Sequence, residues 1–356
     1  MSSKKSGTGR RAKDGEGRPV SLKELAAHLG LSPSTLSLVL NSSPVADSIP
    51  QETKDRIFEA ARGFNYRPNF LARSLRTQRS YTLGVLVPEI SGGYTAEVMN
   101  GIEEHLLKEG YFYIVACHRH KQDLLDEYPT LFLDRCVDGI IAVDTPCRHR
   151  FSLPVVTVSG HEDIRGITNI VLDHERAATL AVEYLVRLGH HQVAVIKGQT
   201  FSSDTEVRWE SIKEAARRAG LAIDERLVAQ LEGDSPSPQI GYIAAKKIMD
   251  AQKPFTALFA FNDTSAIGAI RAFQEAGFRV PDDISVIGFD DIDSAAYHNP
   301  ALTTIRQPLR QMGSLAAEML LRRIAKSDNT DFPELVTVEP ELIVRQSTAT
   351  APPPSA

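Results

Sequence analysis

Residues 20–41 read VSLKELAAHLGLSPSTLSLVLN, and this stretch predicts two short helices joined by a tight turn. Apolar residues in its first half recur at the spacing of one face of a helix. These residues are Leu22, Leu25, Ala26 and Leu29. Gly30 follows them, where glycine commonly ends a helix, and Ser32 and Pro33 suit the start of the next one. The pattern predicts a helix-turn-helix, whose second helix enters the major groove of DNA, although an ordinary helical hairpin has the same spacing.

Three further segments complete the predicted N-terminal region. Residues 50–64, PQETKDRIFEAARGF, predict a third helix, which gives a small three-helix domain over residues 20–64. Residues 1–19 are poor in apolar side chains and predict a disordered basic tail. Residues 65–80, NYRPNFLARSLRTQRS, carry four arginines. They predict either a hinge that folds against DNA or a plain basic linker.

Charge is unevenly distributed along the chain. The 356 residues have a net charge of −5, yet residues 1–80 hold 14 Lys and Arg against 7 Asp and Glu. A basic head on an acidic body is expected if only the head contacts phosphates. The N-terminus lacks the apolar segment of a signal peptide, and no apolar run approaches the length of a membrane span. The sequence therefore predicts a cytoplasmic protein that does not enter a membrane.

From Tyr81 onward, short apolar runs alternate with amphipathic segments, which is typical of parallel sheets with helical crossovers. About 270 residues exceed one such domain, so we predict an α/β body of two lobes. The predicted strands are 83–87, 111–116, 139–143, 155–158, 193–196, 257–261 and 285–288. The predicted helices are 96–108, 124–135, 176–188, 211–219, 241–250, 265–275 and 309–325. The last ten residues, STATAPPPSA, predict a disordered tail.

Polar side chains stand near the ends of two predicted strands and before a predicted helix. Asp290 follows a strand in VIGFDDID, Asn262 follows ALFAF, and Arg208 precedes a helix. Ligands of open α/β sheets bind at the carboxyl ends of strands, so these three side chains could orient a polar ligand. Helix or turn capping by Asp263 and Asp290 explains the same spacing equally well.

Signatures of catalysis and of cofactor binding are absent from the sequence. It has no GxxxxGK[ST], no GxGxxG after a strand, no GxSxG and no HExxH. The histidines do not cluster, and Cys117, Cys136 and Cys147 match no zinc spacing. We therefore predict that the protein is not an enzyme, needs no cofactor or metal, and keeps its three thiols isolated and largely in the core.

Taken together, the motifs resemble the lactose-repressor (LacI/GalR) family of bacterial transcription regulators from about Val20 to Arg345. The resemblance is carried by SLKELAAHLGLSPSTLSLVLN, NYRPNFLARSL, LGVLVPEIS, VDGII, FNDTSAIGAIRAFQEAGFRVPDDISVIGFDDI and LTTIRQP, in this order. It implies a helix-turn-helix head, a hinge and a two-lobed body like a periplasmic binding protein. It also implies a homodimer that binds a near-palindromic double-stranded DNA operator and a small-molecule effector, for which a sugar or sugar derivative is a candidate.

The resemblance also implies how the body is divided. Within residues 81–346 we expect a first lobe of about 81–177 and 308–330 and a second lobe of about 178–306 and 332–346, before a tail at 347–356. The expected crossings between the lobes lie near 176–180, 305–309 and 328–334.

Site residues follow from the family's pattern, residue by residue. The positions that read bases fall on Pro33, Ser34 and Leu38. The positions that contact phosphates fall on Ser21, Thr35, Ser37, Asn41 and Tyr66. The minor-groove wedge of the hinge falls on Leu75, with Ala72 beside it. The effector positions fall on Arg208, Asn262 and Asp290 in the second lobe, with Tyr94 and Thr95 approaching from the first.

The chain departs from the family pattern at several of these places. Leu38 replaces a common arginine, which removes one bidentate guanine contact. Gly92 and Gly93 replace Asn-Pro and are expected to loosen the first loop of the cleft. Ser159 replaces an acidic residue, and Ser235 replaces an aromatic that stacks on a sugar. A solute-binding protein of the periplasmic type remains the alternative function, against which the absent signal peptide and the hinge argue.

Overall fold

The computed structural model describes residues 20–41, 44–66, 79–147, 151–160, 164–234, 237–325 and 332–353. The chain divides into two compact units, residues 1–80 and residues 81–356, which are treated separately below. The predictions for residues 1–19, for Ala72 and Leu75 in the hinge, and for Ser235 lie outside the described residues.

The N-terminal unit contains the predicted helices in the predicted order. They are α1 (Leu22–Leu29), α2 (Pro33–Leu40), the 3₁₀ turn η1 (Pro44–Ser48) and α3 (Gln51–Gly63). Ser21 and Glu24 form a capping box at the start of α1, and Gly30 ends that helix with φ of 66°. Ser32 caps α2 by accepting a hydrogen bond from the backbone N–H of Thr35. The three helices enclose a small core of Leu25, Ala26, Leu36, Val39, Ala46, Ile57 and Ala61.

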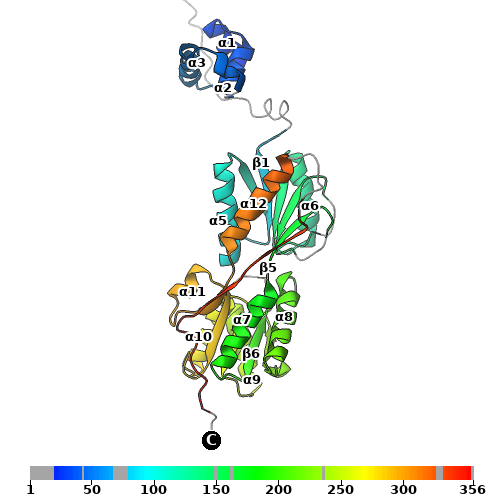
Figure 1. Ribbon diagram of the computed structural model, residues 1–356, viewed down its shortest axis with the longest axis vertical. Coiled ribbons are helices and arrows are strands. Elements are labelled where there is room, and N and C mark those ends of the chain that lie inside the picture. Colours follow the sequence, from blue (N-terminus) through cyan, green and yellow to red (C-terminus); the bar gives the residue numbers. More distant parts are fainter. Residues whose placement is uncertain are drawn as a thin grey trace, which may run out of the picture. The chain divides into compact units, whose positions relative to one another are not determined.

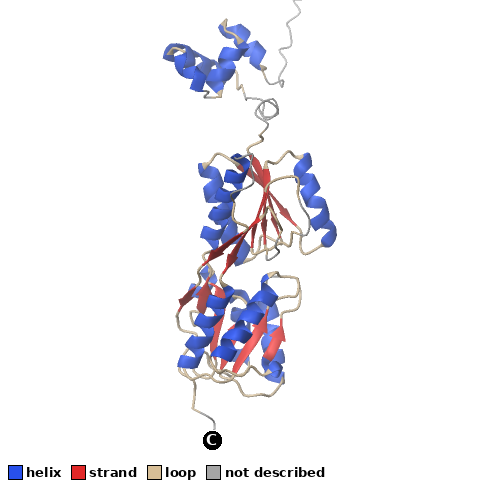
Figure 2. Ribbon diagram, turned by 45° about the vertical axis from the view of Figure 1, so that its right-hand side comes forward, coloured by secondary structure: helices blue, strands red, loops and turns tan. Residues whose placement is uncertain are grey.

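The body consists of two lobes, each built on a six-stranded sheet with helices on both faces (Figures 1 and 2). The first sheet has the order β11-β5-β4-β3-β1-β2, and all its pairs are parallel. Its strands are β1 (Thr82–Val87), β2 (Phe112–Cys117), β3 (Gly139–Val143), β4 (Val155–Val158), β5 (Thr168–Leu172) and β11 (Leu335–Val338). β1, β3, β4 and β5 are buried along their whole length, as expected for parallel strands covered on both faces.

The second sheet has the order β12-β10-β9-β8-β6-β7 and is parallel except for the pair β10–β12. Its strands are β6 (Val193–Lys197), β7 (Val228–Gln230), β8 (Ala257–Ala260), β9 (Ser285–Asp290), β10 (Thr303–Arg306) and β12 (Glu341–Ile343). Its helices are α7 (His174–Arg187), α8 (Asp204–Arg218), α9 (Pro238–Asp250), α10 (Asp263–Glu275) and α11 (Asp293–Tyr297), with the 3₁₀ turn η2 (Glu225–Leu227).

The first lobe is covered by α6 (Gln122–Asp134) and by the pair α5 (Gly93–Lys108) and α12 (Leu309–Ala325), which lie side by side in Figure 1. Glycines let α5 and α12 approach closely. A Cβ at Gly101 would lie 1.9 Å from the carbonyl oxygen of Arg310, and one at Gly313 would lie 2.0 Å from that of Val98. Because the obstacle on both sides is backbone, no larger residue fits at this crossing.

The chain passes between the lobes three times. The first passage is at Asp173 between β5 and α7, slightly before the predicted 176–180, and the second lies between β10 and α12, within the predicted 305–309. The third prediction, 328–334, is wrong. β11 pairs with β5 of the first lobe and β12 with β10 of the second, so the passage falls at residues 339–340. Residues 335–338 therefore belong to the first lobe. β11 is a partly exposed edge strand, so its sequence lacks a buried strand's apolar run.

The C-terminal segment is ordered where a disordered tail was predicted, at least over residues 347–353. Ser347 is buried and its hydroxyl donates to the carbonyl oxygen of Val286, while its own carbonyl accepts from the Val286 N–H. The Ala351 N–H donates to the carbonyl oxygen of Leu188. The prediction failed because these contacts join backbone and hydroxyl groups to distant segments, which a composition of small and polar residues does not reveal.

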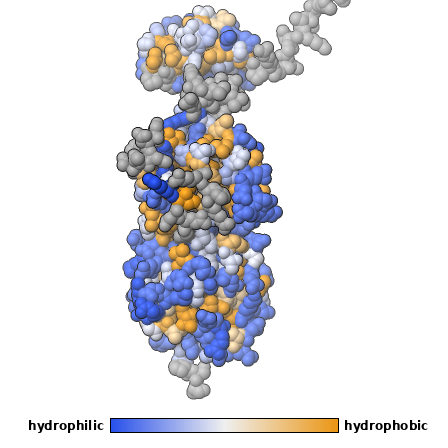
Figure 3. All heavy atoms as spheres, turned by 90° about the vertical axis from the view of Figure 1, so that its right-hand side faces the viewer, coloured by the Kyte–Doolittle hydropathy of each residue, from blue (hydrophilic) through white to orange (hydrophobic). Residues whose placement is uncertain are grey.

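The surface of the body is mixed. On the face drawn in Figure 3, hydrophilic residues cover much of the second lobe, and hydrophobic patches are interspersed among them. Within the described part of the chain, none of the helices combines the length and apolar character needed to cross a membrane. No disulfide joins the three cysteines. Cys147 is buried and Cys117 half-buried, but Cys136 is exposed in the turn after α6, so the prediction of core thiols is wrong there.

Candidate functional site

The helix-turn-helix presents a polar edge at the start of its second helix. Pro33 and Ser34 are exposed on the first turn of α2, where side chains of a recognition helix contact bases. Leu38 is half-buried and packs against the core of the head. Because part of the Leu38 side chain is covered by the core of the head, only the remaining part is available to contact a base.

The residues predicted to contact phosphates already make local hydrogen bonds. Ser21 Oγ accepts from the N–H of Glu24 at 3.3 Å. Asn41 Nδ2 donates to Ser37, to the carbonyl oxygen at 2.6 Å and to Oγ at 3.2 Å. These bonds hold the polar groups at the ends of α1 and α2.

Two more of these residues complete the predicted phosphate-contacting set. The hydroxyls of Thr35 and Ser32 lie 2.8 Å apart. Tyr66 follows α3 and packs on the head core, and its burial raises the pKa of its phenol. Four of the five predicted residues thus stand at or just beyond helix ends, where phosphate contacts are common, whereas Ser37 lies in the middle of α2.

A polar cavity lies between the two lobes of the body. It has a volume of about 100 Å³. Its wall includes all five residues predicted for the effector, namely Tyr94, Thr95, Arg208, Asn262 and Asp290. Tyr94 and Thr95 come from the first turn of α5, and the other three come from α8, from the end of β8 and from the end of β9. The fold therefore brings side chains into one cavity that are separated by up to 196 positions in the sequence, from Tyr94 to Asp290.

Arg208 is the main cationic group of this cavity, and it is held rigidly. Its side chain is 4% exposed, and its guanidinium carbon lies 3.7 Å from the ring centre of Phe289 and 4.3 Å from that of Phe261. One terminal nitrogen donates to the carbonyl oxygen of Phe261, and the other donates to Asp204 at 3.0 Å. Within the described chain, Arg208 Nε is buried without a hydrogen-bond partner.

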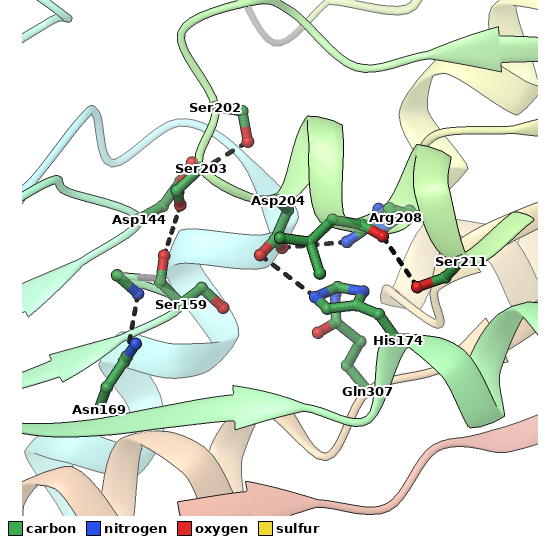
Figure 4. A network of polar contacts seen from close by, with 12 residues as sticks. Asp144, Ser159, Asn169, His174, Ser202, Ser203, Asp204, Arg208, Ser211 and Gln307 are labelled. Atoms are coloured by element: carbon green, nitrogen blue, oxygen red, sulfur yellow. Dashed lines mark hydrogen bonds and ion pairs between the residues drawn. The ribbon is translucent and has the colours of Figure 1, made fainter. Parts of the chain in front are cut away.

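Asp204 joins Arg208 to His174, as Figure 4 shows. Its second oxygen lies 3.4 Å from His174 Nε2, and both side chains are buried. Neither Asp204 nor His174 was predicted as a site residue. The signal for Asp204 was its place four residues before Arg208 on one helix, the spacing at which opposite charges meet. His174 had no comparable signal, because it arrives from α7.

A second carboxylate, Asp144, enters the cavity from the end of β3 in the first lobe. Ser203 Oγ of the second lobe lies 2.9 Å from Asp144 Oδ1 and also donates to the carbonyl oxygen of Ser159 (Figure 4). Burial is the main cause that raises the pKa of Asp144 to about 7, followed by the nearby charge of Asp204. The sequence analysis missed Asp144, although it too follows a predicted strand.

Asp290 occupies a strained backbone position at the carboxyl end of β9. Its φ is 108°, and the next residue, Asp291, has φ of 59°. Non-glycine residues rarely adopt such angles, and they cluster where function requires a particular side-chain direction. Gln307 Nε2 donates to Asp290 Oδ1 at 2.7 Å. Burial raises the pKa of Asp290 to about 7, against the lowering influence of Arg208 and Gln307.

Asn262 and Asp263, the neighbouring residues after β8, differ in whether they face a ligand or serve the local structure. Asn262 caps α10 through a bond from the Ser265 N–H at 2.8 Å, and it also lines the cavity. Asp263 is fully buried, accepts from Thr304 and from the N–H of Ile292, and does not line the cavity. Asn262 therefore combines both roles, whereas Asp263 is structural.

Further contacts cross the mouth of the cavity. The ring of His120 from the first lobe stacks on Phe201 of the second, with 3.6 Å between ring centres. Burial lowers the pKa of His120, which favours its neutral form. A Cβ at Gly93 would lie 2.8 Å from Ile292 Cγ2, so this glycine permits close packing on the second lobe.

The first lobe adds one more ordered contact inside the cavity. The hydroxyl of Tyr94 donates to Ser159 Oγ at 2.9 Å. The departure at Ser159 thus gives Tyr94 a neutral partner. Among the described residues, no three His, Cys, Asp or Glu side chains form a group that could hold a metal ion.

A helix-turn-helix head and a two-lobed body with a polar interlobe cavity together define a ligand-responsive DNA-binding protein. Comparison with known proteins agrees. Residues 21–69 match the family described as bacterial regulatory proteins, lacI family, and residues 182–348 match the periplasmic binding protein-like domain. The HTH-type transcriptional repressor PurR of Aliivibrio fischeri (strain MJ11) is 32% identical over 338 residues, which cover 92% of this chain and 97% of that protein. PurR of Pasteurella multocida is 30% identical over 335 residues, 92% of this chain and 98% of that protein.

The solved structures give the same result. The lac repressor dimer bound to operator and the anti-inducer ONPF has a TM-score of 0.83 and 26% identity, covering 93% of this chain and 100% of that chain. The complex of the transcriptional regulator CelR with cellobiose has a TM-score of 0.67 and 25% identity, with coverage of 93% and 100%. The chain belongs to the lacI family of bacterial regulatory proteins and is a DNA-binding transcriptional regulator. The predicted family and fold class are confirmed.

Proposed function

We propose that this protein represses transcription as a homodimer on a near-palindromic operator, and that a small polar effector in the interlobe cavity controls its affinity for that operator. The observation that carries the proposal is the convergence of Arg208, Asp290 and Tyr94 on one cavity between two lobes. A ligand that contacts both lobes favours one of their relative arrangements, which couples binding in the body to DNA binding by the head.

In this proposal the head reads bases with Pro33, Ser34 and Leu38 and contacts phosphates with the polar groups at its helix ends. Leu75 wedges into the minor groove with Ala72 beside it. The protein acts in the cytoplasm and has no catalytic role, in line with its relatives, which are transcriptional repressors.

A mobility-shift assay with genomic fragments tests the DNA-binding part. Ser34→Asp places a negative charge on the exposed first turn of α2, so it should abolish the shift because it repels phosphates. Ser294→Asp adds the same charge to the exposed surface of α11 in the body, and it should leave the shift unchanged. Equal binding by both variants would refute the assignment of α2 as the recognition helix.

The same fragment, titrated with a low-molecular-weight cell extract, tests effector control. The extract should change the operator affinity of the wild-type protein but not that of Arg208→Ala or Asp290→Ala. Arg217→Ala, an exposed arginine on the same helix as Arg208, is the matched control and should respond like the wild type. If both cavity variants respond like the wild type, the effector binds elsewhere.

A further inference from the structure

The interlobe cavity contains more negative than positive charge. Asp144, Asp204 and Asp290 line it, and Glu89 and Asp234 stand on its wall as well. Arg208 is the only Lys or Arg side chain among the lining residues, all of which are described. His120, the other basic side chain of the wall, has a lowered pKa and does not supply a charge at neutral pH.

The single guanidinium is already paired. Arg208 donates to Asp204, and both side chains are buried, with 4% and 7% of their surface exposed. The other oxygen of Asp204 faces His174. Asp204 and Arg208 thus neutralise each other within the wall, and among the described residues no cation forms an ion pair with the two remaining carboxylates, the half-buried Asp144 and the buried Asp290.

Among the described residues, the hydrogen bonds that Asp144 and Asp290 accept come only from neutral groups, although the nearby charge of Arg208 lowers the pKa of both. Asp144 Oδ1 accepts from the hydroxyls of Ser203, at 2.9 Å, and Ser202, at 3.5 Å. Asp290 is 6% exposed, and its Oδ1 accepts from the amide of Gln307. No hydrogen bond from a described residue reaches Asp290 Oδ2, in a side chain that lines the cavity. A buried carboxylate without a countercharge is costly, and a cationic partner removes that cost.

The three cavity carboxylates come from both lobes, yet all of them influence the phenol of Tyr94. The charges of Asp204, Asp144 and Asp290 all contribute to raising the pKa of the Tyr94 phenol, in addition to its burial. Asp144 belongs to the first lobe, and Asp290 to the second. A positive charge near the Tyr94 hydroxyl would therefore attract both lobes at once.

We propose that the effector carries an organic cationic nitrogen, an ammonium or amidinium group, which binds between Asp144 and Asp290 beside Tyr94. This inference rests on the proposed function of the cavity and names the chemical class of its ligand. The volume of about 100 Å³ restricts the ligand to a compact molecule, so a short diamine fits this arrangement of the lobes more readily than the bulkier amino sugar. Because its nitrogen bridges carboxylates of different lobes, such a ligand holds the lobes together, which a neutral sugar does less strongly.

Calorimetry on the full-length protein at pH 8 tests the proposal with matched probes. Glucosamine is compared with glucose, and 1,4-diaminobutane with 1,4-butanediol; glucose 6-phosphate is the anionic probe and magnesium chloride the metal control. The better amine should bind about 10- to 100-fold more tightly than its neutral counterpart, since hydrogen bonds between charged groups contribute more than neutral ones. Asp290→Asn and Asp144→Asn should each remove most of that preference, whereas Asp224→Asn, at a partly exposed carboxylate away from the cavity wall, should keep it.

Several outcomes would overturn the proposal. One is that a neutral or anionic probe binds as tightly as the amines or more tightly, and another is that only magnesium binds. The proposal also fails if neither amine binds measurably, or if the preference for the amine survives both cavity substitutions. The mobility shift of the wild-type protein is measured in parallel. If the operator is bound while the amine preference is absent, only the ligand class is wrong; if no operator is bound, the proposed function fails independently.

Discussion

Asp290→Asn should stabilise the ligand-free protein in a pH-dependent way. Burial raises the pKa of this carboxyl from its ordinary value of 3.8 to about 7 in the folded protein. Below pH 3.8 the group is protonated in both folded and unfolded chains, and asparagine matches the neutral acid. As the pH rises from 3.8 to about 7, the unfolded chain releases the proton while the folded chain retains it, so the wild type loses stability. The difference between the two pKa values corresponds to a loss of about 4 kcal/mol in the free energy of unfolding of the wild type. This is the upper bound of the effect, and it is reached above pH 7.

Urea denaturation from pH 4 to pH 8 measures this effect through the fluorescence of Trp209, the single tryptophan of the chain, which lies on α8 beside Arg208. The free energy of unfolding of Asp290→Asn should equal that of the wild type near pH 4 and exceed it increasingly towards pH 8. Asp283→Asn is the control, because the hydrogen bond with Arg279 lowers the pKa of this partly exposed carboxyl to about 2, below the pH range of the experiment. A gain that does not depend on pH, or a loss of stability at pH 8, would refute the reasoning.

Three further predictions concern the head, the hinge and the packing of the first lobe. Leu38→Arg should shift the base preference at one position of each half-site by about 1–3 kcal/mol, and an unchanged consensus in a selection from random DNA would contradict this. Leu75→Ala should weaken operator binding and reduce DNA bending, measured by circular-permutation mobility shifts, because the minor-groove wedge is lost; unchanged bending would exclude that role. Gly313→Val should destabilise the body by about 3 kcal/mol or more in thermal denaturation, since its Cβ meets the backbone of Val98 at 2.0 Å, and a loss below about 1 kcal/mol would show that α5 and α12 can separate.

The sequence by itself was sufficient for the helices of the head and for most of the buried strands. The capping box of Ser21 and Glu24, the left-handed Gly30 and the Ser32-Pro33 start of α2 all depend on residues within a few positions of one another. Buried parallel strands such as β1 and β3 need apolar side chains on both faces, so their runs are visible in the sequence. Among the strands that sequence analysis missed, β7, β11 and β12 are short and partly exposed, and their pairing with distant partners leaves no local pattern. β5 and β10 are largely buried, but their polar residues Thr168, Asn169, Thr303 and Thr304 leave only short apolar runs.

The cavity was predictable only in part, for the same reason. The rule that ligands bind at the carboxyl ends of strands pointed to Asn262 and Asp290, and Arg208 stood before a predicted helix. The resemblance then favoured these three residues and added Tyr94 and Thr95. The tertiary structure alone decided that Asp204 neutralises Arg208 and that Asp144 faces the cavity without a cation. It also decided that the chain stays in the first lobe from α12 through β11 before it ends on the second. Helix caps and apolar runs are set by neighbours along the chain, whereas charge balance in a cleft depends on which distant segments the two folded lobes bring together.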